Sequence, residues 1–460
     1  MRPQTKQLAD VIPAPALVVP EPTVTFTVAP DAVAALAPAP RPDGPIRLDL
    51  GDAGGLGPEG YRLEITEGGV TLRAAEPAGL FWGLQTLRQL AGDDGVLPGG
   101  VIEDRPRFAY RAAMVDLARH FFTVDEIKAH VDLLVQFKIN HLHLHLTDDQ
   151  GWRLEIPGWP RLTEVGGGPG TGCDGAGPGF LTLAEYADVV AYAAARFVTV
   201  VPEIDMPGHV NAALVAYPEL TADGQPVAPR TDAEVGYSSL VAGKEETYAF
   251  VEAVLRTVAD VTPGPFLHIG GDECLSTSAE DYRAFLARVL PLPAKYGKRA
   301  IGWHEIAATP LPEGTVVQYW RPLHEEGNLT AVVEAGRQVI MSPADRTYLD
   351  MKYDADTPLG LDWAGLVPLH RAYDWDPAER LPEELLLGVA APLWSETLRS
   401  VADLRYLTFP RLPAVAEVGW TPRAGRDWES FRKRLAGFGP RWDAAGVTWF
   451  RAPEIDWPAG

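Results

Sequence analysis

The stretch that decides the fold is Phe266-Leu267-His268-Ile269-Gly270-Gly271-Asp272-Glu273. Its apolar first half is typical of a buried strand in a parallel sheet that is covered on both faces. Gly270 and Gly271 then permit a sharp turn and leave open space beside the backbone. Asp272 and Glu273 follow at the carboxyl end of the strand. Because successive side chains on extended backbone point in different directions, these two carboxylates can reach different parts of one ligand.

The same two acids also have a purely structural interpretation. Asp272 can serve as the N-cap of the helix expected over residues 278–290, and Glu273 then lies in the connecting loop. The histidine and the two glycines that precede the pair favour a functional site.

The stretch belongs to a longer pattern in which apolar strands alternate with amphipathic helices from Tyr110 onward. Alternation of this kind predicts an α/β fold, a closed (β/α)8 TIM barrel, with its active site at the carboxyl ends of the strands. The expected helices include 124–137, 183–196, 245–261 and a tail at 427–445. The expected strands are 112–117, 139–146, 198–204, 266–269, 300–303, 316–320, 338–341 and 389–394.

A smaller domain is predicted before the barrel. Residues 23–106 contain strand-like runs and one helical pattern at 78–90, which together indicate a small α+β accessory domain. The strand-like runs are 23–28, 46–50, 61–66 and 69–74. Residues 1–22 are rich in proline and alanine, and we expect them to be poorly ordered. The barrel domain is then expected over residues 107–460.

Composition narrows the classes of partner. The chain has 460 residues, 46% of them hydrophobic, and a formal net charge of -22, which argues against nucleic acid and anionic membranes. Its two cysteines cannot form a disulfide framework or a zinc cluster by themselves. No stretch has the length of a membrane span or the pattern of a signal peptide. As written, the sequence predicts a cytoplasmic protein, or a secreted one if its start is truncated; oligomeric state is left open.

Polar and aromatic residues gather directly after the predicted strands. Because charged groups are rarely buried without partners, this concentration at one face of the barrel indicates a site. The residues are Asp116, Arg119, His120, Asp148, Asp149, Glu203, Asp205, His209, Asp272, Glu273, Trp303, His304, Trp320, Tyr348, Asp350, Trp394 and Glu396.

Two groups of these residues have competing interpretations. His141, His143 and His145 alternate with leucines, which suits either a zinc site or a strand face of hydrogen-bonded core histidines. We favour the second, because the bridging lysine and the later histidine ligands of metal-dependent barrel hydrolases are not evident. Glu203 is equally compatible with a structural ion pair and a functional role. Its neighbour His209 can share a proton network with a catalytic acid.

Three tryptophans end strands at the same face. Trp303, Trp320 and Trp394 can form an aromatic box around a small apolar group such as a methyl, or can simply cap the barrel core. Their common position favours the box.

With these residues collected, the sequence resembles the β-N-acetylhexosaminidases of glycoside hydrolase family 20, especially the actinobacterial type. The matching motifs occur in the family's order and span the barrel. They lie at 116–121, 143–152, 201–209, 268–273, 318–320, 345–353 and 393–396.

The resemblance implies an exo-acting enzyme that removes terminal β-linked N-acetylglucosamine or N-acetylgalactosamine with retention, without metal or cofactor. In this family the 2-acetamido oxygen of the substrate attacks the anomeric carbon and forms an oxazolinium intermediate. Glu273 matches the general acid and base, and Asp272 the residue that orients the acetamido nitrogen. Tyr348 matches the hydroxyl that binds the acetamido oxygen. The expected substrate is an oligosaccharide or glycoconjugate, as in the degradation of chitin or N-glycans.

The resemblance also assigns the surrounding residues. Asp148 and His209 match a network that runs to Glu273. The sugar-binding residues are Arg119, Asp350 and Glu396 for the hydroxyls, Trp303, Trp320 and Trp394 for the pocket walls, and Trp363 for the leaving-group side. Three alternatives stay open: a disaccharide-releasing member similar to lacto-N-biosidases, a non-catalytic amino-sugar-binding protein, and a metal-dependent barrel hydrolase. Cys274 stands where the family usually has a small residue, as an inert side chain or an oxidation-sensitive thiol.

Overall fold

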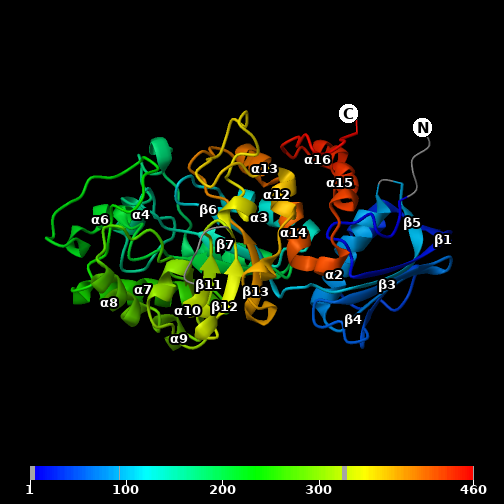
Figure 1. Cartoon of the computed structure of the whole chain (residues 1–460), viewed down its shortest axis with the longest axis horizontal. Helices are drawn as coiled ribbons and strands as arrows, with labels where there is room; N and C mark the ends of the chain where they lie inside the picture. The colour runs from blue at the N-terminus through cyan, green and yellow to red at the C-terminus, as the bar shows by residue number, and fades with distance from the viewer. Residues whose placement is uncertain (1–5, 93, 324–328, 459–460) are drawn as a thin grey trace.

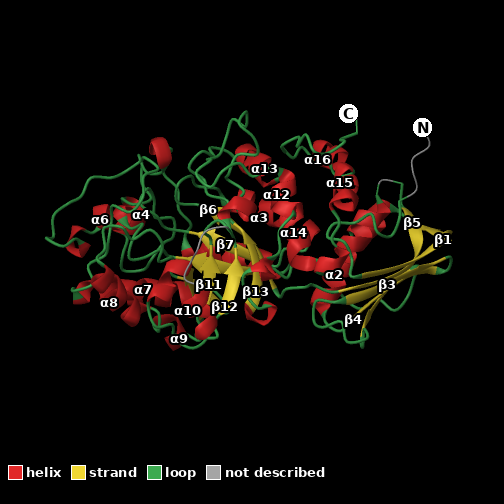
Figure 2. Cartoon of the chain, viewed as in Figure 1, coloured by secondary structure: helices red, strands yellow, loops and turns green. Residues whose placement is uncertain are grey.

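The structure, a computed structural model, describes residues 6–92, 94–323 and 329–458. It consists of two bodies along the long axis of the molecule: a small sheet domain, blue in Figure 1, and a barrel surrounded by helices. Figure 2 shows the two sheets as separate groups of strands. Among the described residues no helix combines the length and the apolar character needed to cross a membrane.

The larger body is a closed barrel of eight parallel strands, as predicted. Its strands follow the order β10-β11-β12-β13-β6-β7-β8-β9 around the ring. They are β6 (Tyr110–Asp116), β7 (His141–His145), β8 (Thr199–Glu203), β9 (Phe266–His268), β10 (Arg299–Trp303), β11 (Val316–Tyr319), β12 (Gln338–Met341) and β13 (Leu386–Ala391).

The interior of the barrel changes character along its axis. Near the amino ends of the strands it is filled by apolar side chains, with Tyr110, Val201, Phe266, Ile301 and Ile340 among them. Toward the carboxyl ends the interior is polar, because β7, β8 and β9 turn histidines and a glutamate inward, all of them fully buried. The polar layer therefore lies directly beneath the site.

Helices cover the outside of the barrel, and α3 and α5 begin with capping boxes. Thr123 and Glu126 form a capping box at the start of α3, and Thr182 and Glu185 do the same for α5. The helices of the barrel domain are α3 (Val124–Leu134), α4 (Arg161–Glu164), α5 (Leu183–Ala194), α6 (Asn211–Ala216), α7 (Glu245–Val261), α8 (Ala279–Val289), α9 (Leu292–Lys295), α10 (Leu329–Glu334), α11 (Ala344–Thr347), α12 (Leu369–Tyr373), α13 (Val401–Thr408), α14 (Arg411–Trp420), α15 (Trp428–Ala436) and α16 (Gly439–Ala444).

The smaller body is a five-stranded sheet with strand order β1-β5-β3-β4-β2. Its long helix α2 (Pro77–Ala91) packs on one face of the sheet, and a short helix α1 (Pro30–Ala34) contacts α2. The strands are β1 (Leu17–Thr27), β2 (Ile46–Leu50), β3 (Tyr61–Thr66), β4 (Gly69–Ala74) and β5 (Val96–Asp104). The strand-like runs of the sequence predicted four of these strands but not β5, which contains the sequence Pro98-Gly99-Gly100.

The amino-terminal segment is packed rather than poorly ordered, so the prediction for residues 1–22 is wrong for residues 6–22. Val11 and Ile12 are buried, and the Ile12 amide donates to Gln89 of α2 at 2.8 Å. The Ala14 amide donates to Glu417 of α14 at 2.9 Å, so this segment contacts both bodies. The prolines make this segment resemble a disordered one, but several apolar residues between them are buried. Residues 1–5 lie outside the described residues.

A buried polar cluster joins the two bodies; we name it the junction cluster and define it as Tyr61, Asp104, Lys138 and Trp420. Asp104 accepts from Lys138 Nζ at 2.8 Å and from the Tyr61 hydroxyl at 2.6 Å on one oxygen. Its other oxygen accepts from the Trp420 indole at 2.9 Å. Since the cluster takes side chains from both bodies, it fixes the sheet domain against the barrel.

Candidate active site

A cavity of about 890 Å³ opens at the carboxyl ends of the barrel strands. Its walls include nine residues that the sequence placed in the site: Arg119, His209, Asp272, Glu273, Trp320, Tyr348, Trp363, Trp394 and Glu396. Three others, Asp148, Trp303 and Asp350, are buried beneath the walls with no more than 1% of their surface exposed. The structure therefore brings these twelve candidate residues together at one end of the barrel.

The turn after β9 aims the two central carboxylates. Gly270 and Gly271 have φ of 66° and 98°, a conformation that favours glycine. A Cβ on Gly270 would lie 1.7 Å from Asp205 Oδ1, so a side chain has no room there. Glu273 itself has φ of 47°, which is strained backbone for a residue with a side chain. Strain of this kind persists only where the surrounding structure holds the residue in that conformation.

The helix that follows the turn does not use Asp272 as its cap. Ser278 is the N-cap of α8, and its hydroxyl accepts from the Asp281 amide at 3.1 Å. The structural interpretation of Asp272 as an N-cap is therefore wrong.

Asp272 and Glu273 differ in their surroundings. Asp272 is 6% exposed, and its Oδ1 accepts no hydrogen bond within the described ranges. Burial raises its pKa, although the nearby His209 opposes the shift. Glu273 is more open, with 34% of its side chain exposed. Burial raises its pKa too, against the opposing charges of His209 and Arg119. For Glu273, a raised pKa favours the protonated form that a general acid requires.

Behind Glu273 lies a chain of charged groups centred on Asp148. Its carboxylate contacts His209 Nδ1 at 3.1 Å, Arg119 Nη1 at 2.8 Å and His145 Nε2 at 2.7 Å. Burial would raise the pKa of Asp148, but Arg119 and His209 outweigh burial and lower it. Burial would likewise lower the pKa of His209, yet Asp148 and Asp272 raise it to about 10. His209 is thus an imidazolium whose Nε2 lies 3.6 Å from Glu273 Oε2.

Aromatic rings enclose the other side of the cavity. Trp394 lies between Trp303 and Tyr348, with ring centroids 5.9 Å and 6.4 Å away. Trp363 meets both Tyr348 and Trp320 edge to face, at 5.9 Å and 5.7 Å. Trp363 is 52% exposed at the mouth, whereas the other four are buried or half-buried. The rings form a small apolar compartment directly beside Asp272 and Glu273.

A second polar group lies on the floor of the cavity. Arg119 is stacked over Trp394, with its guanidinium carbon 5.0 Å from the ring centroid. Burial raises the pKa values of both Asp350 and Glu396, and Asp350 Oδ2 accepts no hydrogen bond from any part of the chain that is described. These oxygens and the guanidinium can bind the hydroxyls of a sugar ring.

Glu305 is a wall residue that the sequence analysis missed. It accepts from the Trp320 indole at 3.1 Å and lines the cavity. Its position two residues after Trp303, at the end of β10, could have identified it, because the other candidates also follow strand ends. Asp205 was noted in the sequence; it lies behind the turn and accepts from the Gly271 amide at 3.0 Å.

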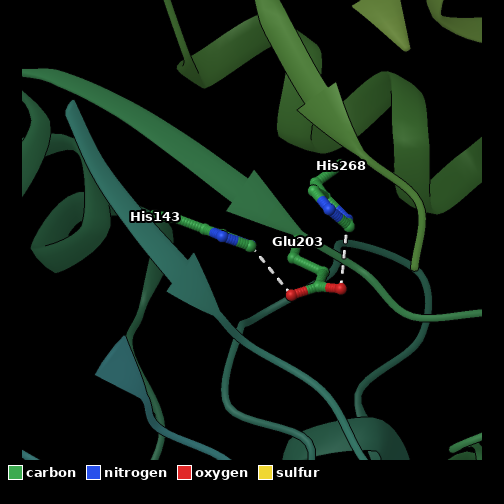
Figure 3. A group of neighbouring side chains, drawn as sticks. All are labelled: His143, Glu203 and His268. Atoms are coloured by element: carbon green, nitrogen blue, oxygen red, sulfur yellow. Dashed lines mark hydrogen bonds and ion pairs between the residues drawn. The ribbon is translucent and has the colours of Figure 1, made fainter. Parts of the chain in front are cut away.

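The alternating histidines of β7 do not share one environment. His141 stacks on Tyr110 at 4.0 Å in the lower barrel, whereas His143 and His145 both contact Glu203, at 2.8 Å and 2.7 Å. Figure 3 shows Glu203 between His143 and His268. These atoms are close enough to surround a metal ion. Glu203 nevertheless already accepts several N–H groups, which agrees with hydrogen-bonded core histidines.

Comparison with known proteins gives one consistent result. The model of the glycosyl hydrolase family 20 catalytic domain matches residues 108–423, and the model of the family's domain 2 matches residues 28–105. The chain is 45% identical over 426 residues to the beta-N-acetylhexosaminidase of Cellulomonas fimi, covering 90% of this chain and 84% of that protein. It is 36% identical over 407 residues to the beta-hexosaminidase of Akkermansia muciniphila, covering 82% of each.

Solved structures agree with these matches. The N-acetyl-beta-hexosaminidase of Streptomyces plicatus in complex with Thio-NAglucal is 46% identical, with a TM-score of 0.93 over 99% of both chains. A mutant of the same enzyme in complex with the product GlcNAc matches equally well, with a TM-score of 0.93, 46% identity and 99% of both chains covered. The barrel, its acid pair and these relatives place the protein among the glycoside hydrolases. More narrowly, the chain belongs to glycosyl hydrolase family 20.

Proposed function

We propose that this protein is an exo-β-N-acetylhexosaminidase, which removes terminal N-acetylglucosamine or N-acetylgalactosamine from oligosaccharides or glycoconjugates. The observation that carries the proposal is the buried Oδ1 of Asp272, beside the aromatic compartment, which receives no hydrogen bond from the residues that the structure describes. A buried carboxylate oxygen without a donor is unfavourable, so the site is built for a ligand that brings one. An acetamido group supplies an N–H for Asp272 and a methyl for the rings.

The first chemical step uses the substrate's own acetamido oxygen. This oxygen attacks the anomeric carbon, the bond from that carbon to the leaving oxygen breaks, and Glu273 gives its proton to the leaving oxygen. The raised pKa of Glu273 favours the protonated form that this step uses. Tyr348, whose pKa is raised by burial, keeps its own proton and can donate it in a hydrogen bond to the acetamido oxygen.

The second step reverses the roles. Water attacks the same carbon of the cyclic oxazolinium intermediate, Glu273 takes a proton from the water, and the acetamido group re-forms. Two displacements at one carbon give net retention. Asp272 acts between the steps, because its negative charge faces the cation as it develops. In the free enzyme that charge is poorly compensated, so the interaction is stronger in the transition state than before it.

The polar groups in the cavity support cleavage at a chain end. Arg119, Asp350 and Glu396 would bind the hydroxyls of the last sugar there, above the buried polar layer of the barrel. Trp363 stands exposed at the mouth, where it can stack on the leaving group. The GlcNAc complex of the Streptomyces plicatus mutant supports the same substrate class.

The experiment compares two chromogenic substrates that differ only in the 2-substituent. We expect rapid cleavage of the β-N-acetylglucosaminide and none of the β-glucoside, with a chelator present in both reactions. Cleavage of both would contradict a required acetamido group. Cleavage of neither, by folded protein, would contradict the proposed activity and favour a binding protein or the release of a larger unit.

A further inference from the structure

Glu203 is a fully buried carboxylate that no step of the proposed mechanism uses. It ends β8 and accepts hydrogen bonds from three different side chains. Oε2 accepts from His143 Nε2 at 2.8 Å and from His145 Nδ1 at 2.7 Å. Oε1 accepts from the Trp303 indole at 2.8 Å, and His268 Nδ1 lies 3.0 Å from the same oxygen (Figure 3). Glu203 thus connects β7, β9 and β10 at the level just below the cavity.

Two of these contacts lead into the active site. The first passes through Trp303, whose ring lies 5.9 Å from that of Trp394, a wall of the aromatic compartment. The second passes through His145, whose Nε2 lies 2.7 Å from Asp148 Oδ2. Asp148 contacts His209 at 3.1 Å, and His209 lies 3.6 Å from Glu273. One carboxylate therefore contacts residues that hold both the aromatic compartment and the general acid Glu273 in place.

We propose that Glu203 is a positioning residue. It fixes the position of the aromatic compartment relative to Glu273 and to the residues behind it, Asp148 and His209. The inference rests on the proposed function and deepens it. Substrate-assisted chemistry needs the acetamido oxygen and the acid proton on opposite sides of one carbon. A displacement of about 1 Å between groups of this kind costs on the order of 100-fold in rate. A shared buried anchor prevents such a displacement.

The chemistry of the contacts requires a carboxylate at this position. His145 bonds carboxylates through both ring nitrogens, so it carries both protons, and it lies between Glu203 and Asp148. A glutamine would offer one carbonyl oxygen and one NH₂ to N–H donors on both sides. Whichever way its amide is turned, the NH₂ faces at least one donor. Either Trp303 loses its acceptor or His145 loses a proton and with it the charge that faces Asp148.

The test is Glu203→Gln, with Glu417→Gln as a matched control. Glu417 is also a fully buried glutamate in an ion pair, with Arg434 Nη1 at 2.7 Å, but it lies in α14 away from the cavity. We expect Glu203→Gln to lower kcat/KM for the β-N-acetylglucosaminide about 100-fold. Affinity for a thiazoline analogue of the oxazolinium intermediate, measured by calorimetry, should fall about tenfold or more. Glu417→Gln should lower the melting temperature with kcat/KM unchanged.

A double-mutant cycle with Trp303→Phe separates positioning from general destabilisation. Trp303→Phe removes the indole N–H and keeps an aromatic ring, so Glu203 loses one of its two routes to the site. The loss caused by Glu203→Gln should then be smaller in the Trp303→Phe background than in the wild type. Equal losses in both backgrounds would overturn the proposal. So would a folded Glu203→Gln protein with wild-type kcat/KM and wild-type affinity for the thiazoline.

If Glu203→Gln does not accumulate as folded protein, Glu203→Asp takes its place. Aspartate keeps the charge but withdraws the carboxylate by one methylene group from Trp303 and His145. We expect the thiazoline affinity to fall, and wild-type affinity would overturn the proposal. Failure of the proposed function is distinguished by the wild type, which would then neither cleave the acetamido sugar nor bind the thiazoline.

Discussion

Two buried polar clusters in this molecule are built in opposite ways. In the junction cluster, both oxygens of Asp104 accept hydrogen bonds, from Lys138, Tyr61 and Trp420 among others. At the carboxyl face, Asp272 Oδ1 and His209 Nε2 are buried and make no hydrogen bond to any residue that the structure describes. The first cluster is complete within the protein, and the second is not.

The difference shows how a functional cluster can be told from a structural one. A satisfied network contributes to stability and has no capacity left for a ligand. An unsatisfied one costs stability in the free protein, and that cost is relieved when a ligand of complementary chemistry binds. The two clusters should therefore respond to mutation in opposite ways.

The largest effect is expected at the general acid. Glu273→Gln should lose about 10²- to 10⁴-fold in kcat/KM on alkyl or sugar leaving groups, because the leaving oxygen then departs without a proton. An aryl leaving group of low pKa needs less protonation, so its loss should be smaller. Steady-state kinetics on both substrates, with melting curves as a check on folding, provide the measurement. Equal losses on both substrates would remove Glu273 from this role.

Mutation of the junction cluster should lower the free energy of unfolding and not the activity. Lys138→Met leaves Asp104 buried without its cation, and breaking a buried pair in this way costs about 3–5 kcal/mol. Denaturant unfolding measures the loss, and kcat/KM per folded molecule should stay at the wild-type value. A large loss of activity without loss of stability would show that the two clusters are not separate.

Asp272→Asn should have the opposite profile to Lys138→Met. We expect a loss on the order of 100-fold in kcat/KM, because the amide cannot balance the developing cation. Stability should be unchanged or higher, since the variant removes a buried charge whose pKa is raised by burial. A variant that melts well below the wild type would mean that Asp272 is a structural residue.

A smaller effect on stability is expected when the pH is raised into the alkaline range. The carboxylates that contact His145 and His209 raise both pKa values to about 10, from about 6.5 in the unfolded chain. A raised pKa contributes stability that is present below pH 6.5 and is lost as the pH rises to about 10. Melting temperatures across this window should therefore fall. The fall should be shallower for His209→Gln, and an identical slope would contradict the assignment.

The smallest effect is expected at Cys274. Its thiol donates to the Asp272 carbonyl at 3.1 Å, and burial raises its pKa, so the reactive thiolate is not formed at neutral pH. Cys274→Ser should change kcat/KM by less than about twofold, and iodoacetamide should leave the activity intact. Rapid inactivation by iodoacetamide would instead support the oxidation-sensitive interpretation of this residue.

The sequence predicted the barrel well because mostly apolar strand-like runs alternate with helical patterns from Tyr110 onward. It failed where local signals and tertiary packing disagree. β5 contains Pro98-Gly99-Gly100, which is typical of a turn, yet Pro98 pairs with β1 and Gly100 pairs with both β1 and β3. Residues 6–16 have a disordered composition but are held by contacts to Gln89 and Glu417, which are far away in the sequence.

Much of the candidate site was expected from the sequence, because strand ends concentrate polar and aromatic side chains in a barrel. What the sequence could not give was the link between them. Glu203 and His145 are 58 residues apart, and Trp303 is 100 residues from Glu203, so their hydrogen bonds leave no local pattern. The sequence therefore left Glu203 undecided between a structural and a functional role.

The strained turn at Gly270–Glu273 has a consequence for directed evolution. Glu273 has a positive φ, and the buried carboxylates beside it lack full compensation. Substitutions such as Glu273→Gly or Asp272→Asn relieve these costs, so they should stabilise the fold while they destroy the chemistry. A library selected for heat resistance alone would collect changes in this turn. Selection for a more thermostable enzyme must therefore include an assay of catalytic activity in every round.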